Sequence, residues 1–110
     1  MIYLASPYSH PDPAVRTARF RETCVHAARL MREGRLVYAP IAHSHPLAEL
    51  GCPGDWPFWA EHNRRMLGVC SELVVLALPG WDESRGIAAE LAIAAELELP
   101  VRFEAPAEAH

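Results

Sequence analysis

The chain has 110 residues, of which 51% are hydrophobic, and a formal charge of −4; this length and composition suit one domain with one core. All ten basic residues are arginines, and they form no basic run, which argues against binding to long nucleic acid through many phosphates. No apolar stretch approaches the ~20 residues that cross a bilayer, and the N-terminus lacks a signal-peptide pattern, so we expect a cytoplasmic protein without a membrane segment.

The N-terminal third predicts a strand, a loop and a long helix. Met1–Ala5 is a short apolar run typical of a strand. Ser6–Pro13 contains three prolines, which are incompatible with a regular helix or a central strand, so a rigid loop is expected. A helix is predicted over Pro13–Glu33, with Asp12 as its N-cap and Gly34 directly after its end.

The middle third is less regular. Leu36–Ala39 is predicted as the second strand, ended by Pro40. Ile41–Pro57 is rich in proline, glycine and histidine, and we expect an irregular segment there. Apolar residues at helical spacing then predict a helix over Pro57–Val69.

The C-terminal third contains the clearest strand. Leu73–Leu78 is apolar on both faces, which is typical of a central strand in a parallel sheet. After a turn, a helix is predicted from about Ser84, and Leu99–Phe103 is predicted as a final short strand followed by a flexible tail over residues 104–110. The expected core face of this last helix consists of Ile87, Leu91, Ala94 and Ala95.

Strands that alternate with helices predict a parallel sheet covered by helices on both faces. We therefore expect residues 1–103 to form a three-layer α/β sandwich of the Rossmann or flavodoxin type, with four or five strands. In such folds the ligand binds beyond the carboxyl ends of the strands. Those ends lead into Ser6–His10, Ile41–His45 and Trp81–Gly86, so these three segments are predicted to form the site.

The segment from Ser84 to Glu90 carries the most informative pattern. If Ser84 caps the helix, the backbone N–H groups of Arg85, Gly86 and Ile87 point toward the strand ends and suit a phosphate. Gly86 has no Cβ to obstruct a ligand. Glu90 lies four residues after Gly86, on the same helix face, so its carboxylate can look across the site. The alternative interpretation is an ordinary capped helix with a solvated glutamate.

Other polar and aromatic residues in the predicted loops are weaker candidates. His43 and His45 could share a zinc ion, but no third ligand has the usual spacing, so we predict no metal and assign them to the base or sugar pocket or to a hydrogen bond within the loop. Tyr8 and Trp81 either stack on a base from opposite sides or pack internally. Asp55–Trp59 forms an acidic-aromatic cluster suited to a mobile lid or a subunit contact.

Several of these motifs occur together in one known group of enzymes. Tyr3 in the first strand, the loop Ser6–Ser9 and the pattern Ser84-x-Gly86-x-x-x-Glu90 together resemble the nucleoside 2-deoxyribosyltransferase superfamily. The chain is most similar to the small DUF1937 branch, through IYLASPYSHPDP, HSHP and LPGW-x-x-S-x-G-x-x-x-E. The resemblance extends to about Phe103 and implies the same α/β fold.

The resemblance assigns roles to individual residues. It implies that Glu90 attacks the anomeric carbon and forms a glycosyl–enzyme intermediate, which water or a second base then resolves. Tyr3 matches the tyrosine that orients this glutamate through a hydrogen bond. Ser84 matches the serine of the superfamily's nucleoside 5′-monophosphate N-glycosidases, whereas the transferases have an acidic residue there. The implied phosphate site therefore comprises Ser6, Ser84 and Gly86.

Asn63 departs from the superfamily's pattern. The helix that contains it usually carries an aspartate near this position, which holds or protonates the leaving base. An amide can hydrogen-bond a base edge but cannot deliver a proton, so protonation of the leaving group would need another acid. The base or sugar pocket implied by the motifs comprises Tyr8, His43, His45, Asn63 and Trp81.

Three functions from different classes follow. The first is cleavage or transfer of the N-glycosidic bond of a nucleoside or its 5′-monophosphate, without a cofactor, by a homodimer or homotetramer that binds neither long nucleic acid nor membrane. The second is a non-catalytic nucleotide-binding or sensor module, which Asn63 favours. The third is a metal-dependent hydrolase that uses His43 and His45.

Overall fold

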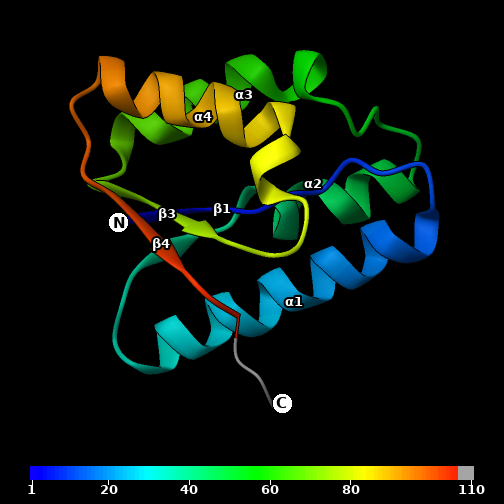
Figure 1. The fold of residues 1–110 in the computed structure, drawn as a ribbon, viewed down its shortest axis with the longest axis horizontal. Helices are drawn as coiled ribbons and strands as arrows, with labels where there is room; N and C mark the ends of the chain where they lie inside the picture. The colour runs from blue at the N-terminus through cyan, green and yellow to red at the C-terminus, as the bar shows by residue number, and fades with distance from the viewer. Residues whose placement is uncertain (107–110) are drawn as a thin grey trace.

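The computed structural model describes residues 1–106 and contains a four-stranded, all-parallel sheet of order β2-β1-β3-β4 (Figure 1). This arrangement confirms the predicted Rossmann-like α/β class. The elements in chain order are β1 Ile2–Ala5, α1 Pro13–Arg32, β2 Val37–Tyr38, α2 Pro40–Glu49, α3 Trp56–Val69, β3 Glu72–Leu76, the short 3₁₀ helix η1 Trp81–Glu83, α4 Arg85–Glu96 and β4 Val101–Glu104.

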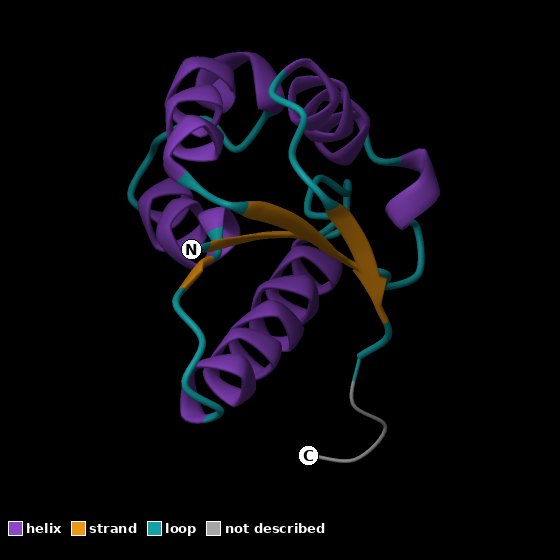
Figure 2. Ribbon diagram, turned by 90° about the vertical axis from the view of Figure 1, so that its left-hand side faces the viewer, coloured by secondary structure: helices purple, strands orange, loops and turns teal. Residues whose placement is uncertain are grey.

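Alternating side chains of the two central strands build two separate cores. In β1, Tyr3 and Ala5 belong to the cluster that includes residues of α3 and α4. Ile2 and Leu4 belong to the opposite cluster, which includes residues of α1. Figures 1 and 2 show the sheet between these two layers of helices. Because successive strand residues point to opposite faces, the position of Tyr3 fixes its side chain on the α4 side.

The helix ends form where the sequence predicts them. Asp12 Oδ1 accepts a hydrogen bond from the Ala14 N–H over 2.9 Å at the start of α1, and Gly34 has a φ of 91° just after its end. Ser84 Oγ accepts from the Ile87 N–H over 3.2 Å and caps α4. Among residues 1–106, no helix combines the length and the apolarity needed to span a membrane.

The prediction of an irregular segment over Ile41–Pro57 is wrong for the first half of that segment, which forms helix α2. Pro40 is at the start of this helix, where a missing N–H costs nothing. Pro46 lies inside it on the exposed side, so the carbonyl that it leaves without an intrahelical donor faces water. Ile41 and His45 are buried one turn apart, and their packing outweighs the low helix propensity of the two prolines.

Smaller differences affect the C-terminal elements. Ile93 and not Ala95 faces the core of α4, where Ala95 is exposed. Strand β4 continues to Glu104, one residue beyond the predicted end. The rest of the predicted tail lies partly outside the described residues, since positions 107–110 are not described.

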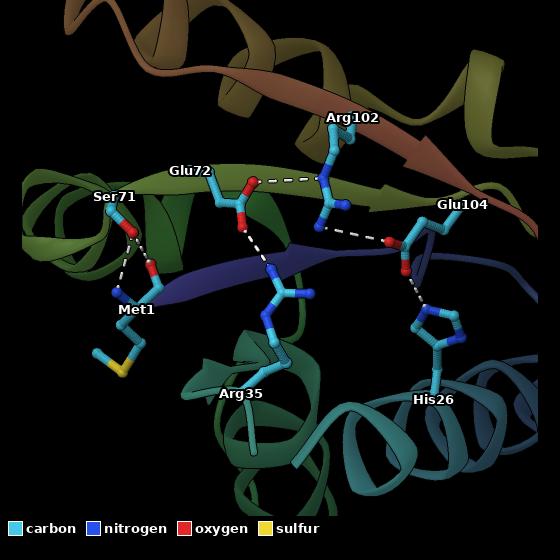
Figure 3. Close-up of polar contacts among 7 residues, drawn as sticks. All are labelled: Met1, His26, Arg35, Ser71, Glu72, Arg102 and Glu104. Atoms are coloured by element: carbon cyan, nitrogen blue, oxygen red, sulfur yellow. Dashed lines mark hydrogen bonds and ion pairs between the residues drawn. The ribbon is translucent and has the colours of Figure 1, made fainter. Parts of the chain in front are cut away.

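A chain of charged contacts joins the edge of the sheet to α1 (Figure 3). Arg35 and Arg102 both pair with Glu72, at 2.8 and 3.3 Å. Arg102 also pairs with Glu104 at 3.4 Å, and Glu104 lies 2.8 Å from His26 of α1. These contacts give β4 a charged edge, which disfavours strand pairing with other chains.

Candidate functional site

A cleft of about 430 Å³ lies at the carboxyl ends of β1, β2 and β3. Its lining includes residues from three segments: Ser6, Tyr8, Ser9 and His10; Pro40, Ile41 and Ser44; and Gly80, Glu83, Ser84, Arg85 and Gly86. The three segments selected by the sequence pattern therefore meet around one cavity. A volume of a few hundred Å³ is typical of small-molecule sites, and it can accommodate a nucleotide-sized ligand.

Glu90 lines the cleft from the second turn of α4, and only 5% of it is exposed. The hydroxyl of Tyr3, a fully buried residue of β1, donates a hydrogen bond to Glu90 Oε2 over 2.5 Å. The predicted pairing of these two residues is therefore present. A strand and a helix fix this carboxyl group at the wall of the cavity, where one oxygen is held by the tyrosine.

Burial determines the charge of this pair. Desolvation raises the pKa of Glu90 from 4.5 to about 8, and the hydrogen bond from Tyr3 opposes that rise. Burial, followed by the charge of Glu90, raises the pKa of Tyr3 above its ordinary value, so its hydroxyl keeps its proton. At pH 7 about one tenth of Glu90 is ionised when its pKa is about 8.

The buried carboxyl group predicts that Glu90→Gln stabilises the protein at alkaline pH. In the unfolded chain Glu90 titrates near 4.5, and in the folded protein near 8. Between these values the folded state binds more protons than the unfolded state, so stability falls as the pH rises. At about 1.4 kcal/mol per pKa unit, the variant gains up to a few kcal/mol over the wild type.

Thermal unfolding of both proteins at about pH 5 and pH 8.5 checks this prediction. The variant should have the higher Tm at the alkaline pH, by about 5 °C or more for a domain of this size. The difference should be much smaller at the acidic pH. A difference in Tm that does not grow with pH would show that Glu90 is not protonated in the folded protein.

The start of α4 forms the second polar part of the cleft. Ser84 and Gly86 both line it, as predicted. The Ile87 N–H, however, donates to Ser84 Oγ, so the prediction that it is open to a ligand is wrong. The N–H groups of Arg85 and Gly86 have no acceptor within the helix, as is general for the first turn. A Cβ at Gly86 would lie 3.8 Å from the ring of Trp56, so this aromatic side chain adjoins the helix start.

Asn63 of α3 has a buried, unpaired acceptor next to the cleft. Its side chain lines the cavity and is 7% exposed. Its Oδ1 atom has no hydrogen-bond partner among residues 1–106. Buried side-chain oxygens are normally paired, so this atom is suited to accept a hydrogen bond from a ligand, as the sequence predicts for a base edge.

The first loop contributes two further predicted residues, each tied to a helix. Ser6 is buried, and its hydroxyl lies 2.7 Å from Thr23 Oγ1 of α1. The hydroxyl of Tyr8 lies 2.6 Å from Nδ1 of His45 in α2. Both residues line the cleft, so α1 and α2 hold this part of the loop in place.

Three residues predicted for the base or sugar pocket, His43, His45 and Trp81, do not line the cleft; the hydrogen bond of His45 to Tyr8 and the packing of Trp81 agree with the alternative interpretations. His45 is buried and stacks on Phe20 with ring centroids 4.2 Å apart. His43 stacks on His62 at 5.4 Å. Trp81 packs against Phe103 at 5.1 Å. The two histidines point in different directions because α2 is helical, and positions 43 and 45 are about 200° apart around its axis.

The separated histidines do not support the metal-dependent alternative. His45 lies 3.5 Å from Glu49 and is bonded to Tyr8, whereas His43 faces Trp59 and His62. No group of three or more His, Cys, Asp or Glu side chains in residues 1–106 is placed to hold a metal ion.

Arg19 is a lining residue that the sequence reasoning missed. Its Nη1 donates to the Ser9 carbonyl over 3.1 Å, and its Nη2 donates to the Pro79 carbonyl over 3.2 Å. It therefore ties the loop after β1 to the loop after β3. A Cβ at Gly80, where φ is 92°, would lie 2.6 Å from Nη2, so this glycine makes the contact possible. An arginine on an amphipathic helix gives no sequence signal for such a role.

Asp55, Trp56 and Trp59 of the predicted acidic-aromatic cluster also line the cleft. The Trp59 indole donates to the Pro53 carbonyl over 2.8 Å, which fixes the turn before α3. Phe58 points outward and is half exposed. These three residues therefore form one wall of the cavity.

A comparison with protein families identifies the family of the chain. The family model described as a domain of unknown function, DUF1937, matches residues 1–105. No curated protein matches the chain.

Proposed function

We propose that this chain, which belongs to the DUF1937 family, cleaves or transfers the N-glycosidic bond of a nucleoside or a nucleoside 5′-monophosphate, with Glu90 as nucleophile. The observation that carries this proposal is the hydrogen-bonded pair of Tyr3 and Glu90 in the wall of the cleft. The resemblance of the surrounding motifs to the nucleoside 2-deoxyribosyltransferase superfamily supports the same assignment.

The distance between Gly86 and Glu90 along α4 suits the distance between the phosphate and the sugar of a nucleotide. Gly86 lies in the first turn, where open N–H groups and the helix dipole favour an anion. Glu90 follows four residues later, about 6 Å along the helix axis at 1.5 Å per residue. A phosphate on the first turn would thus leave the sugar beside the carboxylate, and the unpaired oxygen of Asn63 would accept from the base.

The proposed reaction has two displacements. The ionised carboxylate of Glu90 attacks C1′, and the C1′–N bond breaks with its electron pair moving to the base. Water or a second base then attacks C1′ of the glycosyl–enzyme and releases the carboxylate. Tyr3 stabilises the ionised form of Glu90, because its hydroxyl donates to Oε2.

A substrate panel tests this function. Purified protein is incubated with the four deoxynucleosides, their 5′-monophosphates and the matching ribonucleotides, with and without acceptor bases, and the products are separated by chromatography. Free base without an acceptor identifies a hydrolase, and a new nucleoside or nucleotide identifies a transferase. If neither product forms from any substrate, the proposal is wrong.

Ser84→Asp should reduce the use of monophosphates selectively. The aspartate adds a negative charge at the start of α4, and this charge repels a phosphate. We expect KM for the monophosphate to rise about tenfold or more, which corresponds to a loss of about 1.4 kcal/mol of binding free energy. Aspartate is as good an N-cap as serine, so α4 should keep its stability. The matching unphosphorylated nucleoside is the control and should keep its KM; an equal loss on both substrates would contradict a phosphate site here.

The structure also favours a second candidate, a nucleotide-binding module without catalysis. Its supporting observation is Asn63, which lines the cleft where a proton donor would assist the reaction. Calorimetry that detects nucleotide binding, together with no release of base over hours, would favour this function over the enzyme.

A further inference from the structure

The proposed reaction requires a proton that none of the residues assigned so far supplies. When the C1′–N bond breaks, the base nitrogen gains an electron pair and leaves more readily if it is protonated. Asn63 cannot donate such a proton as an acid, and Glu90 acts in its ionised form. The donor must therefore be another group of the cleft.

A chain of polar contacts, one hydrogen bond and one ion pair, reaches from the cleft to the surface through α2. The hydroxyl of Tyr8, which lines the cleft, lies 2.6 Å from Nδ1 of His45. Nε2 of the same ring lies 3.5 Å from Glu49 Oε1, one helical turn further. The Glu49 side chain is 68% exposed, whereas that of His45 is 7% exposed. The chain thus connects a phenol in the cavity with a carboxylate in water.

The surroundings of His45 hold this chain in one arrangement. Its ring stacks on Phe20 of α1 with an interplanar angle of 22°, and the ring of Tyr8 meets it edge-on at 5.6 Å. The packed ring keeps Nδ1 next to the Tyr8 hydroxyl and Nε2 next to the Glu49 carboxylate. Imidazole is the side chain best suited to exchange protons near neutral pH.

We propose that Tyr8 is the general acid that protonates the leaving base, and that His45 and Glu49 are positioning residues that return a proton to it. This inference rests on the proposed glycosidase function. Nδ1–H of His45 donates to the Tyr8 oxygen, which leaves the phenol O–H free to donate into the cleft. Burial raises the pKa of Tyr8, so the phenol keeps the proton that it must give.

The protons balance over the two displacements. In the first, the C1′–N pair takes the phenol proton of Tyr8, Tyr8 takes the Nδ1 proton of His45, Nε2 of His45 takes a proton from water beside Glu49, and Glu90 bonds to C1′. In the second, water attacks C1′ and gives one proton through Tyr8 to Nδ1 of His45, and Nε2 returns its proton to water. Glu90 leaves as carboxylate, and the net reaction is hydrolysis of the glycoside to a sugar and a protonated base.

A leaving-group comparison tests the relay. The substrates are 2′-deoxyguanosine 5′-monophosphate and its N7-methyl derivative, whose cationic base leaves without protonation. Tyr8→Phe and His45→Gln are expected to lower kcat/KM on the first substrate by about 10²-fold or more. On the methylated substrate both variants should stay within about threefold of wild type. Glu49→Gln should show the same pattern more weakly, because its site is open to water.

His43→Gln is the matched control, since it alters a histidine of the same helix that lies outside the cleft; its rates should equal those of the wild type. Equal losses of kcat/KM on both substrates in Tyr8→Phe would show that the contacts of Tyr8, His45 and Glu49 have only a structural role, and would overturn the relay. No loss on either substrate would overturn it as well and would point to Asp55 or Glu83 as the acid. If the wild-type protein prefers another purine nucleotide of the panel, that nucleotide and its N7-methyl derivative replace this pair; a wild-type protein that releases no base from any substrate of the panel would instead contradict the proposed function.

Discussion

Replacing Glu90 by glutamine is expected to lower the rate of base release by about 10⁴-fold or more, a loss typical for removal of a nucleophile. Gln keeps the size of the side chain and can still accept the hydrogen bond from Tyr3, but it cannot form the glycosyl ester. Binding of the nucleotide should change little, because Glu90 is mostly uncharged in the free protein at neutral pH. Chromatography of released base and calorimetric titration measure the two effects separately.

Glu96→Gln provides the control for this variant. Glu96 is on the same helix but pairs with Arg64 at the surface, at 3.1 Å. Its replacement should leave the rate of base release unchanged. Turnover by Glu90→Gln at the wild-type rate would remove Glu90 from the mechanism.

The second large effect concerns pH. Because only ionised Glu90 attacks, kcat/KM is expected to rise about tenfold per pH unit on the acid side and to level near pH 8, the pKa of this group. Tyr3→Phe removes the hydrogen bond that lowers this pKa. A hydrogen bond to a charged group contributes about 1.5–3 kcal/mol, so the rising limb should move to higher pH by about one unit or more.

Tyr38→Phe serves as the control for the pH experiment. The ring of Tyr38 packs against Tyr3 at 5.8 Å, but its hydroxyl has no hydrogen-bond partner within residues 1–106. Removing this hydroxyl should therefore leave the pH dependence of kcat/KM unchanged. A rate that falls as the pH passes through 8 would contradict a nucleophilic Glu90 and would identify this group as a proton donor.

Local patterns predicted the architecture because they depend on short-range chemistry. Two-sided apolarity placed β3 in the centre of the sheet, and Asp12 and Ser84 marked helix starts through their own hydrogen bonds. Helix α2 was missed because Pro40 and Pro46 are usually helix-ending signals. Its stability comes from packing against α1 and β1, which a local pattern does not contain.

The candidate site was predicted where residues share one helix and missed where they depend on distant contacts. Ser84, Gly86 and Glu90 were predicted from their spacing within α4 together with the resemblance to the superfamily. The burial of Glu90, and with it the raised pKa, depends on the neighbouring sheet and helices. The positions of His43 and His45 outside the lining of the cleft were not predicted, because α2 was expected to be a loop. Arg19 was not predicted, because its acceptors lie in two loops that only the fold brings together.

The proposed mechanism makes Glu90 covalently bonded to a sugar for part of each turnover. A 2-deoxy-2-fluoro-arabinosyl nucleoside 5′-monophosphate slows the second displacement, because the fluorine destabilises the oxocarbenium-like transition state. After incubation with this compound, the intact mass should increase by one fluorinated sugar phosphate. Trypsin cuts after Arg85 and Arg102, so fragmentation of peptide 86–102 should locate the added mass.

The added mass on Glu90, and its absence in Glu90→Gln, is the result that the mechanism predicts. Glu96 and Glu98 in the same peptide should remain unmodified. Release of base by the wild type without any adduct, or an adduct on another side chain, would contradict a glycosyl–enzyme formed on the carboxylate that Tyr3 holds in the cleft.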